Sequence, residues 1–111
     1  MTKRDIIEDF IRQFREFGND VVYCFNNGMC FHFAFILKTR FGPGPEIVYD
    51  PIINHFACKI DDRIYDITGD ITDNEEYSWH DWNRFMYQDT SLTKRLYRDC
   101  INFGGEEYGM V

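Results

Sequence analysis

The amino-acid sequence predicts a single α+β domain spanning residues 1–111, in which helices at both ends of the chain enclose a set of antiparallel strands. Apolar residues recur at helical spacing near the N-terminus, and a nearly continuous apolar run follows at 30–39. From residue 46 the pattern changes to short β-rich runs that turn residues separate. A chain of 111 residues can bury a core without metal or disulfide crosslinks.

The first predicted helix covers residues 5–17. Asp5 and Glu8 fit the acidic variant of a capping box at its start, and Gly18 fits the C′ position after its end. Its apolar face consists of Ile6, Ile7, Phe10, Ile11, Phe14 and Phe17. Because the opposite face is charged, we expect this helix to pack on the core without a chemical role.

The segment that follows leads to the most hydrophobic part of the chain. Residues 21–25 form a short apolar run that is typical of a strand or an extended lead-in, and 26–28 is a turn sequence. The run at 30–39 is apolar on nearly every side. It therefore predicts a central helix that is covered on most sides and packs on a small antiparallel sheet.

Three strands are predicted in the middle of the chain, at 47–49, 54–60 and 63–68. Asp61 and Asp62 form the expected turn between the second and the third, and Gly69 ends the third. An acidic loop at 70–77 should follow these strands.

Two further helices are expected near the C-terminus. Ser78 is the predicted cap of the first, with Asp81 at its third position, and this helix carries Trp79, Trp82, Phe85 and Met86. The second begins at Thr90 or Ser91, and its apolar residues are Leu92, Leu96, Tyr97, Cys100 and Ile101. The glycine-rich tail, residues 104–111, is expected to be mobile.

Net charge and hydropathy exclude several classes of function. A net charge of −7 argues against nucleic-acid binding, because neutralising phosphates requires a basic surface. No apolar run reaches the ~18 residues of a membrane span, and the N-terminus lacks the apolar core of a signal peptide. We therefore expect a cytoplasmic protein that has no membrane contact and keeps its thiols reduced.

Cysteine is the residue type that points to chemistry. Cys30 follows a glycine turn and opens the buried helix, where the partial positive charge of the helix end stabilises a thiolate. Cys24, Cys58 and Cys100 lie in apolar surroundings and are interpreted as small core residues. Neither the cysteine spacing nor the acidic loops match a zinc or calcium site, so no metal or cofactor is expected.

The geometry of the predicted hairpin supplies partners for Cys30. If Asp61 and Asp62 form a two-residue loop, Ile60 lies opposite Arg63, and His55 and Asp66 point to the same face as diagonal neighbours. A four-residue loop preserves this arrangement, whereas a three-residue loop would place His55 and Asp66 on opposite faces.

This arrangement predicts a catalytic triad. Cys30 would be the nucleophile, His55 the base that takes the thiol proton, and Asp66 the group that orients the imidazole. The backbone N–H of Cys30 would be one oxyanion donor. The second donor could come from Asn26, Asn27 or Tyr23, between which the sequence does not decide.

The simpler structural interpretation of each residue also has to be considered. A cysteine in an apolar run is most often a core residue, and the same holds for Trp79 and Trp82. His32 lies on the far side of the helix from Cys30, which makes it a weaker base candidate. His80 is expected at the surface.

The phrase from Asn27 to Ala34, together with the phrase from His55 to Asp66, resembles compact members of the papain-like superfamily. These include NlpC/P60-type peptidases, transglutaminase-like proteins, and small bacterial and phage proteins with the same core. The resemblance implies a papain-like fold in which the nucleophile opens a central helix and the histidine and acid follow on antiparallel strands. The Ser-Gly that follows the cysteine in NlpC/P60 proteins is Phe31-His32 here, so the substrate class does not carry over.

Two hypotheses follow. The first is a cysteine hydrolase or acyl-transfer enzyme that cleaves an amide of a peptide or protein substrate, by peptide or isopeptide cleavage or by deamidation. The second is a catalytically inactive phage or bacterial module that binds a protein partner, where the acidic surface would suit a basic partner or mimic a nucleic acid. For a phage-encoded protein the compartment would be the host cytoplasm. Access to Cys30 separates the two hypotheses.

Overall fold

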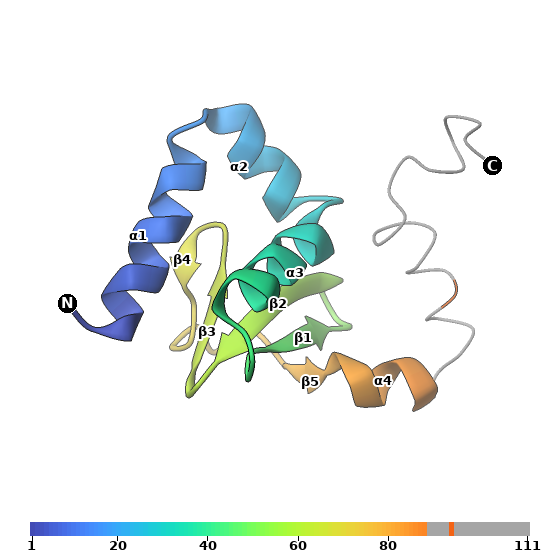
Figure 1. Cartoon of the computed structure of the whole chain (residues 1–111). Helices are drawn as coiled ribbons and strands as arrows, with labels where there is room; N and C mark the ends of the chain where they lie inside the picture. Colours follow the sequence, from blue (N-terminus) through green and yellow to red (C-terminus); the bar gives the residue numbers. More distant parts are fainter. Residues whose placement is uncertain (89–93, 95–111) are drawn as a thin grey trace.

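The computed structural model of the protein describes residues 1–88 and Lys94, and it confirms the α+β class. The helices of this part are α1 (Lys3–Arg15), α2 (Asn19–Asn26), α3 (Cys30–Phe41) and α4 (Trp82–Gln88) (Figure 1). The strands are β1 (Glu46–Asp50), β2 (His55–Ile60), β3 (Arg63–Asp66), β4 (Gly69–Asp70) and β5 (His80–Asp81). No helix among the described residues is both long and apolar enough to cross a membrane.

The strands form one antiparallel sheet in the order β4-β3-β2-β1-β5, and α3 packs against its centre (Figure 1). The sheet contains the three predicted strands and two short edge strands that the sequence did not predict. One of these, β4, begins at Gly69, whose φ of +114° lets the chain turn back at the position where the sequence predicted only an end.

The hairpin of β2 and β3 has the predicted register. Ile60 lies opposite Arg63, Lys59 opposite Ile64, and Cys58 opposite Tyr65, so the loop consists of Asp61 and Asp62 alone. Asp61 adopts a positive φ of 56°, which an aspartate tolerates better than most residues. The even loop length is therefore confirmed, and with it the shared face of His55 and Asp66.

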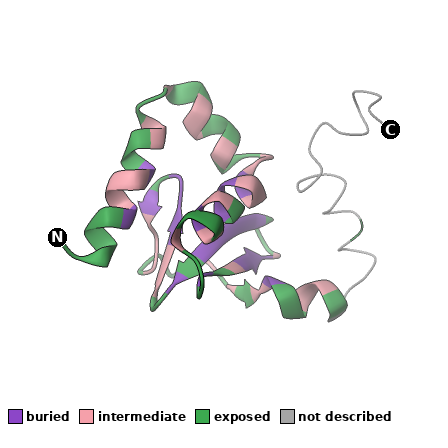
Figure 2. Ribbon diagram, viewed as in Figure 1, coloured by how far each residue is buried: buried purple, intermediate pink, exposed green. Residues whose placement is uncertain are grey.

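The core lies between α3 and the sheet, with α1 packed beside it. Alternate residues of β2 contribute to this core, whereas His55 points to the other face of the strand. Figure 2 shows the buried positions gathered on β2 and on the side of α3 that contacts it. The fully buried residues of the core include Ile7, Ile11, Phe33, Leu37, Phe56, Cys58, Ile60 and Ile67.

Helix α1 begins earlier than predicted. Thr2 is its N-cap and forms a capping box with Asp5, because the threonine hydroxyl accepts from the Asp5 N–H while the Asp5 carboxylate accepts from the Thr2 N–H. The predicted capping box of Asp5 and Glu8 is therefore wrong, because the observed capping box lies three residues earlier in the chain. Phe17 lies beyond the helix end and is 74% exposed, so it does not belong to the buried face.

Residues 21–25 are helical, and the prediction of a strand or extended segment is wrong. The run lies within α2, where Val22 and Phe25 pack on the core while Tyr23 and Cys24 are exposed. Tertiary packing decides this conformation, because the ring of Phe25 contacts both Phe14 and Phe33. A five-residue apolar run does not by itself distinguish strand from helix. The exposure of Cys24 also corrects its prediction as a core residue.

The helix predicted from Ser78 begins instead at Trp82. His80 and Asp81 form β5 and pair with β1, while the Asp81 carboxylate accepts from the Asn83 N–H at the helix start. Asp81 therefore lies before the helix rather than at its third position. The predicted last helix, the core position of Cys100 and the mobile tail lie outside the described residues.

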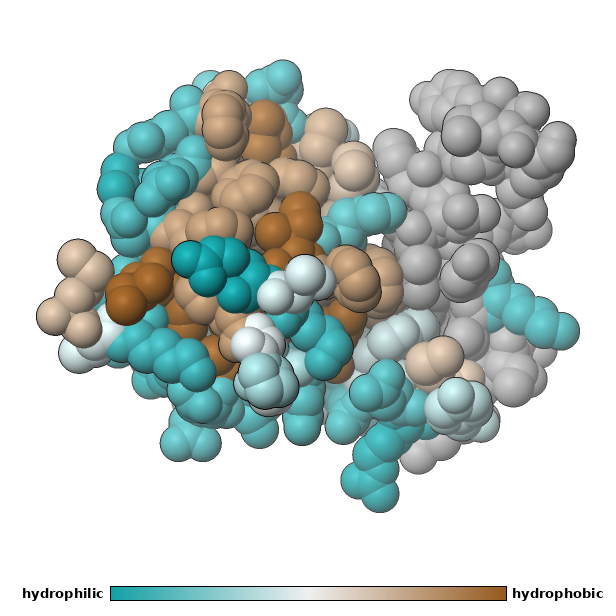
Figure 3. Space-filling view, viewed as in Figure 1, coloured by the Kyte–Doolittle hydropathy of each residue, from teal (hydrophilic) through white to brown (hydrophobic). Residues whose placement is uncertain are grey.

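Helix α3 is covered on fewer sides than its composition predicted. Cys30, Phe33, Ala34 and Leu37 are buried against the sheet, but Phe35 on the outer side is 53% exposed within the described part of the chain. Figure 3 shows a broad apolar area over α2 and α3.

We predict that Phe56→Ala lowers the free energy of unfolding by about 3–5 kcal/mol. The ring of Phe56 is fully buried, and its centroid lies 4.6 Å from that of Tyr49 and 4.9 Å from that of Trp82, so its loss leaves a cavity. The matched control is Phe17→Ala, which removes an exposed ring and should change stability by about 0.5 kcal/mol or less. Urea unfolding measures both, and equal effects would contradict this description of the core.

Candidate functional site

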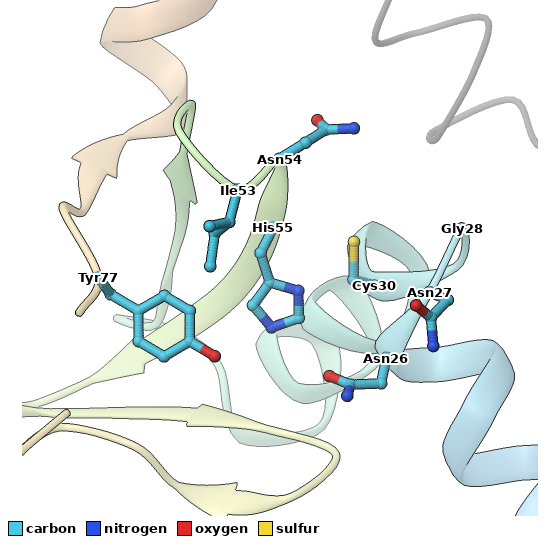
Figure 4. Close-up of a pocket in the computed structure, with 8 residues that line it drawn as sticks. All are labelled: Asn26, Asn27, Gly28, Cys30, Ile53, Asn54, His55 and Tyr77. Atoms are coloured by element: carbon cyan, nitrogen blue, oxygen red, sulfur yellow. The ribbon is translucent and has the colours of Figure 1, made fainter.

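A pocket of about 400 Å³ opens where the α2–α3 turn faces the start of β2 (Figure 4). One wall comes from the α2–α3 turn, and the opposite wall comes from the β1–β2 turn and from the segment before β5. The lining residues are Asn26, Asn27, Gly28, Cys30, Ile53, Asn54, His55 and Tyr77. The sequence-predicted nucleophile and base thus lie together at one hollow.

Cys30 is the first residue of α3. Gly28 adopts a φ of 68°, and this left-handed turn brings the chain from α2 into α3. The N–H of Cys30 has no partner within the helix, so the first turn directs free donors and a partial positive charge toward the thiol. The residue is only 3% exposed, yet it forms part of the pocket lining.

His55 and Asp66 form the predicted pair. The His55 Nε2–H donates to Asp66 Oδ2 at 2.8 Å, and both side chains are buried. The other carboxylate oxygen, Oδ1, accepts from the backbone N–H of Thr68 at 2.8 Å and from its hydroxyl at 2.5 Å. Asp66 is therefore fixed from both sides, and it holds the imidazole with Nδ1 turned toward Cys30 (Figure 4).

The pKa of His55 is raised from 6.5 to about 9. Burial acts in the opposite direction and is the largest single influence, but hydrogen bonds to Asp66 and Cys30, with the negative charges of those two groups, outweigh it. The imidazole therefore keeps its proton at neutral pH. A protonated imidazole beside a thiol favours the thiolate, which is the nucleophilic form.

Aromatic rings cover the imidazole. The ring of Tyr77 stacks on His55 at 5.8 Å between centroids, and Trp79 stacks on Tyr77 at 4.7 Å. These rings shield one face of the hydrogen bond between His55 and Asp66 from water. Covering the imidazole in this way lowers its pKa by desolvation, but it also strengthens the attraction of the protonated ring to Asp66, because an electrostatic interaction is stronger where water is excluded.

Asp50 forms hydrogen bonds to both segments of the pocket wall around His55, the β1–β2 turn and the segment before β5. Its carboxylate is fully buried and accepts from the backbone N–H groups of Ile52, Ile53 and Ser78. The first two belong to the β1–β2 turn, and the third is next to Tyr77. The predicted strand at 47–49 stops just before Asp50, and an aspartate before a proline is a common turn signal, but the sequence does not predict these three hydrogen bonds.

The structure separates the three candidates for the second oxyanion donor. Tyr23 is 68% exposed and does not line the pocket, so it does not fit this role. The amide of Asn27 lines the pocket, but it donates to the Tyr23 carbonyl at 3.0 Å. The Asn26 amide also lines the pocket and has no hydrogen bond within the described residues.

Sequence reasoning missed Ile53, Asn54 and Tyr77, which come from turns without a periodic pattern. The remaining histidines have no place in the pocket. His80 is exposed as predicted, and His32 lies in a separate apolar hollow. No group of three or more potential metal ligands occurs among the residues that the structure describes.

The remaining described cysteines differ from Cys30 in their surroundings. Cys58 is fully buried, as predicted, and burial raises its pKa to about 12, which keeps it protonated and inert. Cys24 is an exposed free thiol away from the pocket and provides a natural internal reference for thiol reactivity.

The raised pKa of His55 predicts a pH-dependent stability. Folding strengthens proton binding at His55, so its stabilisation is complete below pH 6.5 and is lost as the pH rises through about 9. Urea midpoints should therefore fall over this window in the wild type, with a clearly smaller fall in His55→Gln. The exposed residue His80 gives the control, since His80→Gln should keep the wild-type slope. Identical slopes in all three proteins would refute the assignment.

Comparisons with known proteins identify the family. Residues 7–99 match the family described as Phage YunG-like protein. No curated protein and no solved structure matches the chain. The matched range includes every residue that lines the pocket, together with Asp66. Because the match covers well over half of the 111 residues, the chain belongs to the family of Phage YunG-like proteins.

Proposed function

We propose that the protein is a cysteine hydrolase or acyl-transfer enzyme that acts on an amide of a peptide or protein. The observation that carries the proposal is that Cys30 and His55 line one pocket, and that His55 is hydrogen-bonded to Asp66 behind it. A nucleophile, a base and a group that orients the base are the parts that covalent acyl transfer requires.

The reaction follows from the positions of these groups. Because the imidazole of His55 already holds its proton at neutral pH, the Cys30 sulfur attacks the amide carbonyl carbon without a separate proton-transfer step. His55 then gives that proton to the leaving nitrogen as the C–N bond breaks, which leaves a thioester on Cys30. Water, or another acceptor in a transfer reaction, attacks the thioester while His55 accepts its proton; the C–S bond then breaks, and the Cys30 sulfur is again free beside the protonated imidazole. Asp66 keeps the imidazole oriented throughout.

The tetrahedral intermediate needs donors for its oxyanion. The backbone N–H of Cys30 at the start of α3 is one donor. We assign the second to the Asn26 amide, because it borders the pocket without another hydrogen bond in the described part of the chain, whereas the Asn27 amide is engaged.

The arrangement is also the basis for proposing a papain-like core. The nucleophile opens a helix that packs on an antiparallel sheet, and the histidine and acid follow on adjacent strands. Because Cys24, Cys30 and Cys58 are free thiols, we place the protein in a reducing compartment, which for a phage-encoded protein is the host cytoplasm.

The low exposure of Cys30 favours a second candidate function, an inactive module of the same fold that binds a protein partner. In that case the net charge of −7 would favour a basic partner. The two candidates differ in the reactivity of Cys30 in the folded protein.

We predict that Cys30 reacts with iodoacetamide at pH 6.5 about tenfold faster than the exposed Cys24, because Cys30 lines the pocket beside His55 at the start of α3, whereas Cys24 lies outside it. His55→Ala should remove this advantage, whereas His80→Ala should not. Mass spectrometry of peptides from the briefly labelled native protein measures each thiol separately. If Cys30 stays unmodified until the protein unfolds, the enzyme proposal fails and the binding module stands.

We further predict that Asn26→Ala slows acylation of Cys30 by p-nitrophenyl acetate by about 10²-fold, the usual effect of losing one oxyanion donor. Alkylation by iodoacetamide forms no oxyanion, so its rate should be unchanged in the same variant. Asn27→Ala is the matched control and should have the smaller effect on acylation. A loss of both reactions in Asn26→Ala would indicate a structural role instead.

A further inference from the structure

The pocket wall formed by the α2–α3 turn carries two consecutive side-chain amides, those of Asn26 and Asn27. The orientation of the Asn27 amide is fixed, because its nitrogen donates to the Tyr23 carbonyl at 3.0 Å and a carbonyl oxygen can only accept. Its own oxygen is therefore the end left for the pocket, and Figure 4 shows this oxygen turned toward Cys30. With Asn26 as the donor to the oxyanion, one wall presents a donor and an acceptor on neighbouring residues.

A primary carboxamide has an edge that matches this wall. Its carbonyl oxygen accepts a hydrogen bond, and one of its two N–H groups points to the same side as that oxygen and donates. In a trans peptide bond the next Cα occupies that side of the nitrogen, and the single N–H points the opposite way. The wall can therefore bind the oxygen and an N–H of a primary carboxamide together, but only the oxygen of a backbone amide.

Access to the nucleophile favours the same kind of amide. Cys30 is only 3% exposed, so a narrow group reaches it more easily than a broad one. A backbone amide continues into the main chain on both sides, and both arms would have to enter the pocket together. A side-chain carboxamide enters end first, and glutamine carries it on one more methylene than asparagine. The lining of the pocket is also mostly polar, which suits a carboxamide.

We propose that the scissile bond is the side-chain amide of a glutamine in a peptide or protein, which makes the protein a deamidase. This inference rests on the proposed function. The Cys30 sulfur bonds to the carboxamide carbon, the C–N bond breaks, and the nitrogen takes the His55 proton and leaves as ammonia. Water then attacks the thioester and gives a proton back to His55, and the C–S bond breaks, so that glutamine becomes glutamate. Asn27 binds the N–H that distinguishes this amide from a backbone amide.

The test offers the full chain two peptides at millimolar concentration, N-acetyl-Ala-Gln-Ala and the same peptide with a methyl group on the side-chain nitrogen. Mass spectrometry should show the first peptide converted to N-acetyl-Ala-Glu-Ala with its backbone intact, and ammonia should be released. The methyl group replaces the N–H that faces Asn27, so the second peptide should react about tenfold more slowly or less. Cys30→Ala should abolish both reactions.

The variant Asn27→Ala tests the acceptor separately from the nucleophile. It should slow the release of ammonia about tenfold, the effect of one lost hydrogen bond, and should slow acylation by p-nitrophenyl acetate much less, because that ester has no N–H. The ester reaction also shows whether the site is intact in the variant. Asn83→Ala, a change at an exposed asparagine outside the pocket, should leave both rates unchanged. An equal fall of both rates in Asn27→Ala would overturn the inference.

The other contrary results separate this inference from the proposed function. If p-nitrophenyl acetate acylates Cys30 but the glutamine peptide stays unchanged or is cleaved in its backbone, the glutamine inference is overturned while the proposed function stands. Equal rates for the two peptides also overturn it, since the wall then does not recognise the N–H. If Cys30 reacts with neither p-nitrophenyl acetate nor iodoacetamide, the proposed function fails, and the glutamine inference fails with it.

Discussion

The pairing of β2 with β3 is the constraint on which the rest of the structure depends. Side chains alternate between the two faces of a strand, so a shift of one residue would reverse every position of β2. In the observed register Phe56 and Cys58 point into the core beneath α3, and His55 points to the opposite face beside Asp66. One register therefore serves the hydrophobic core and the polar site together, and neither can be changed alone.

The position of Cys30 depends, in addition, on where α3 begins. Phe33 and Leu37 are buried against the sheet, and this packing sets the position of the whole helix. The positive φ of Gly28 determines where Cys30, the first residue of the helix, lies. Cys30 is consequently held by packing on one side and by the turn on the other. It lies with His55 of β2 in the lining of one pocket, where the start of the helix meets the edge of the sheet.

The sequence was sufficient to predict the parts of the fold that repeat a pattern. The α+β class, the central helix and the hairpin register follow from periodicity and from a turn of even length. The helix at 21–25 was missed because packing, rather than local pattern, decides the conformation of so short an apolar run. The pair of His55 and Asp66 could be predicted from strand geometry. Tyr77 could not, because only the tertiary fold brings its loop to the imidazole.

The hydrogen bonds of Asp50 have a mechanical consequence for the pocket. One carboxylate holds both the turn that carries Ile53 and the segment that carries Tyr77. The two parts of this wall are thereby linked at a single buried point and must move as one body. The pocket would therefore widen by displacement of its opposite wall, the α2–α3 turn around Gly28, and that turn is where a bulky polypeptide would gain access to the sulfur.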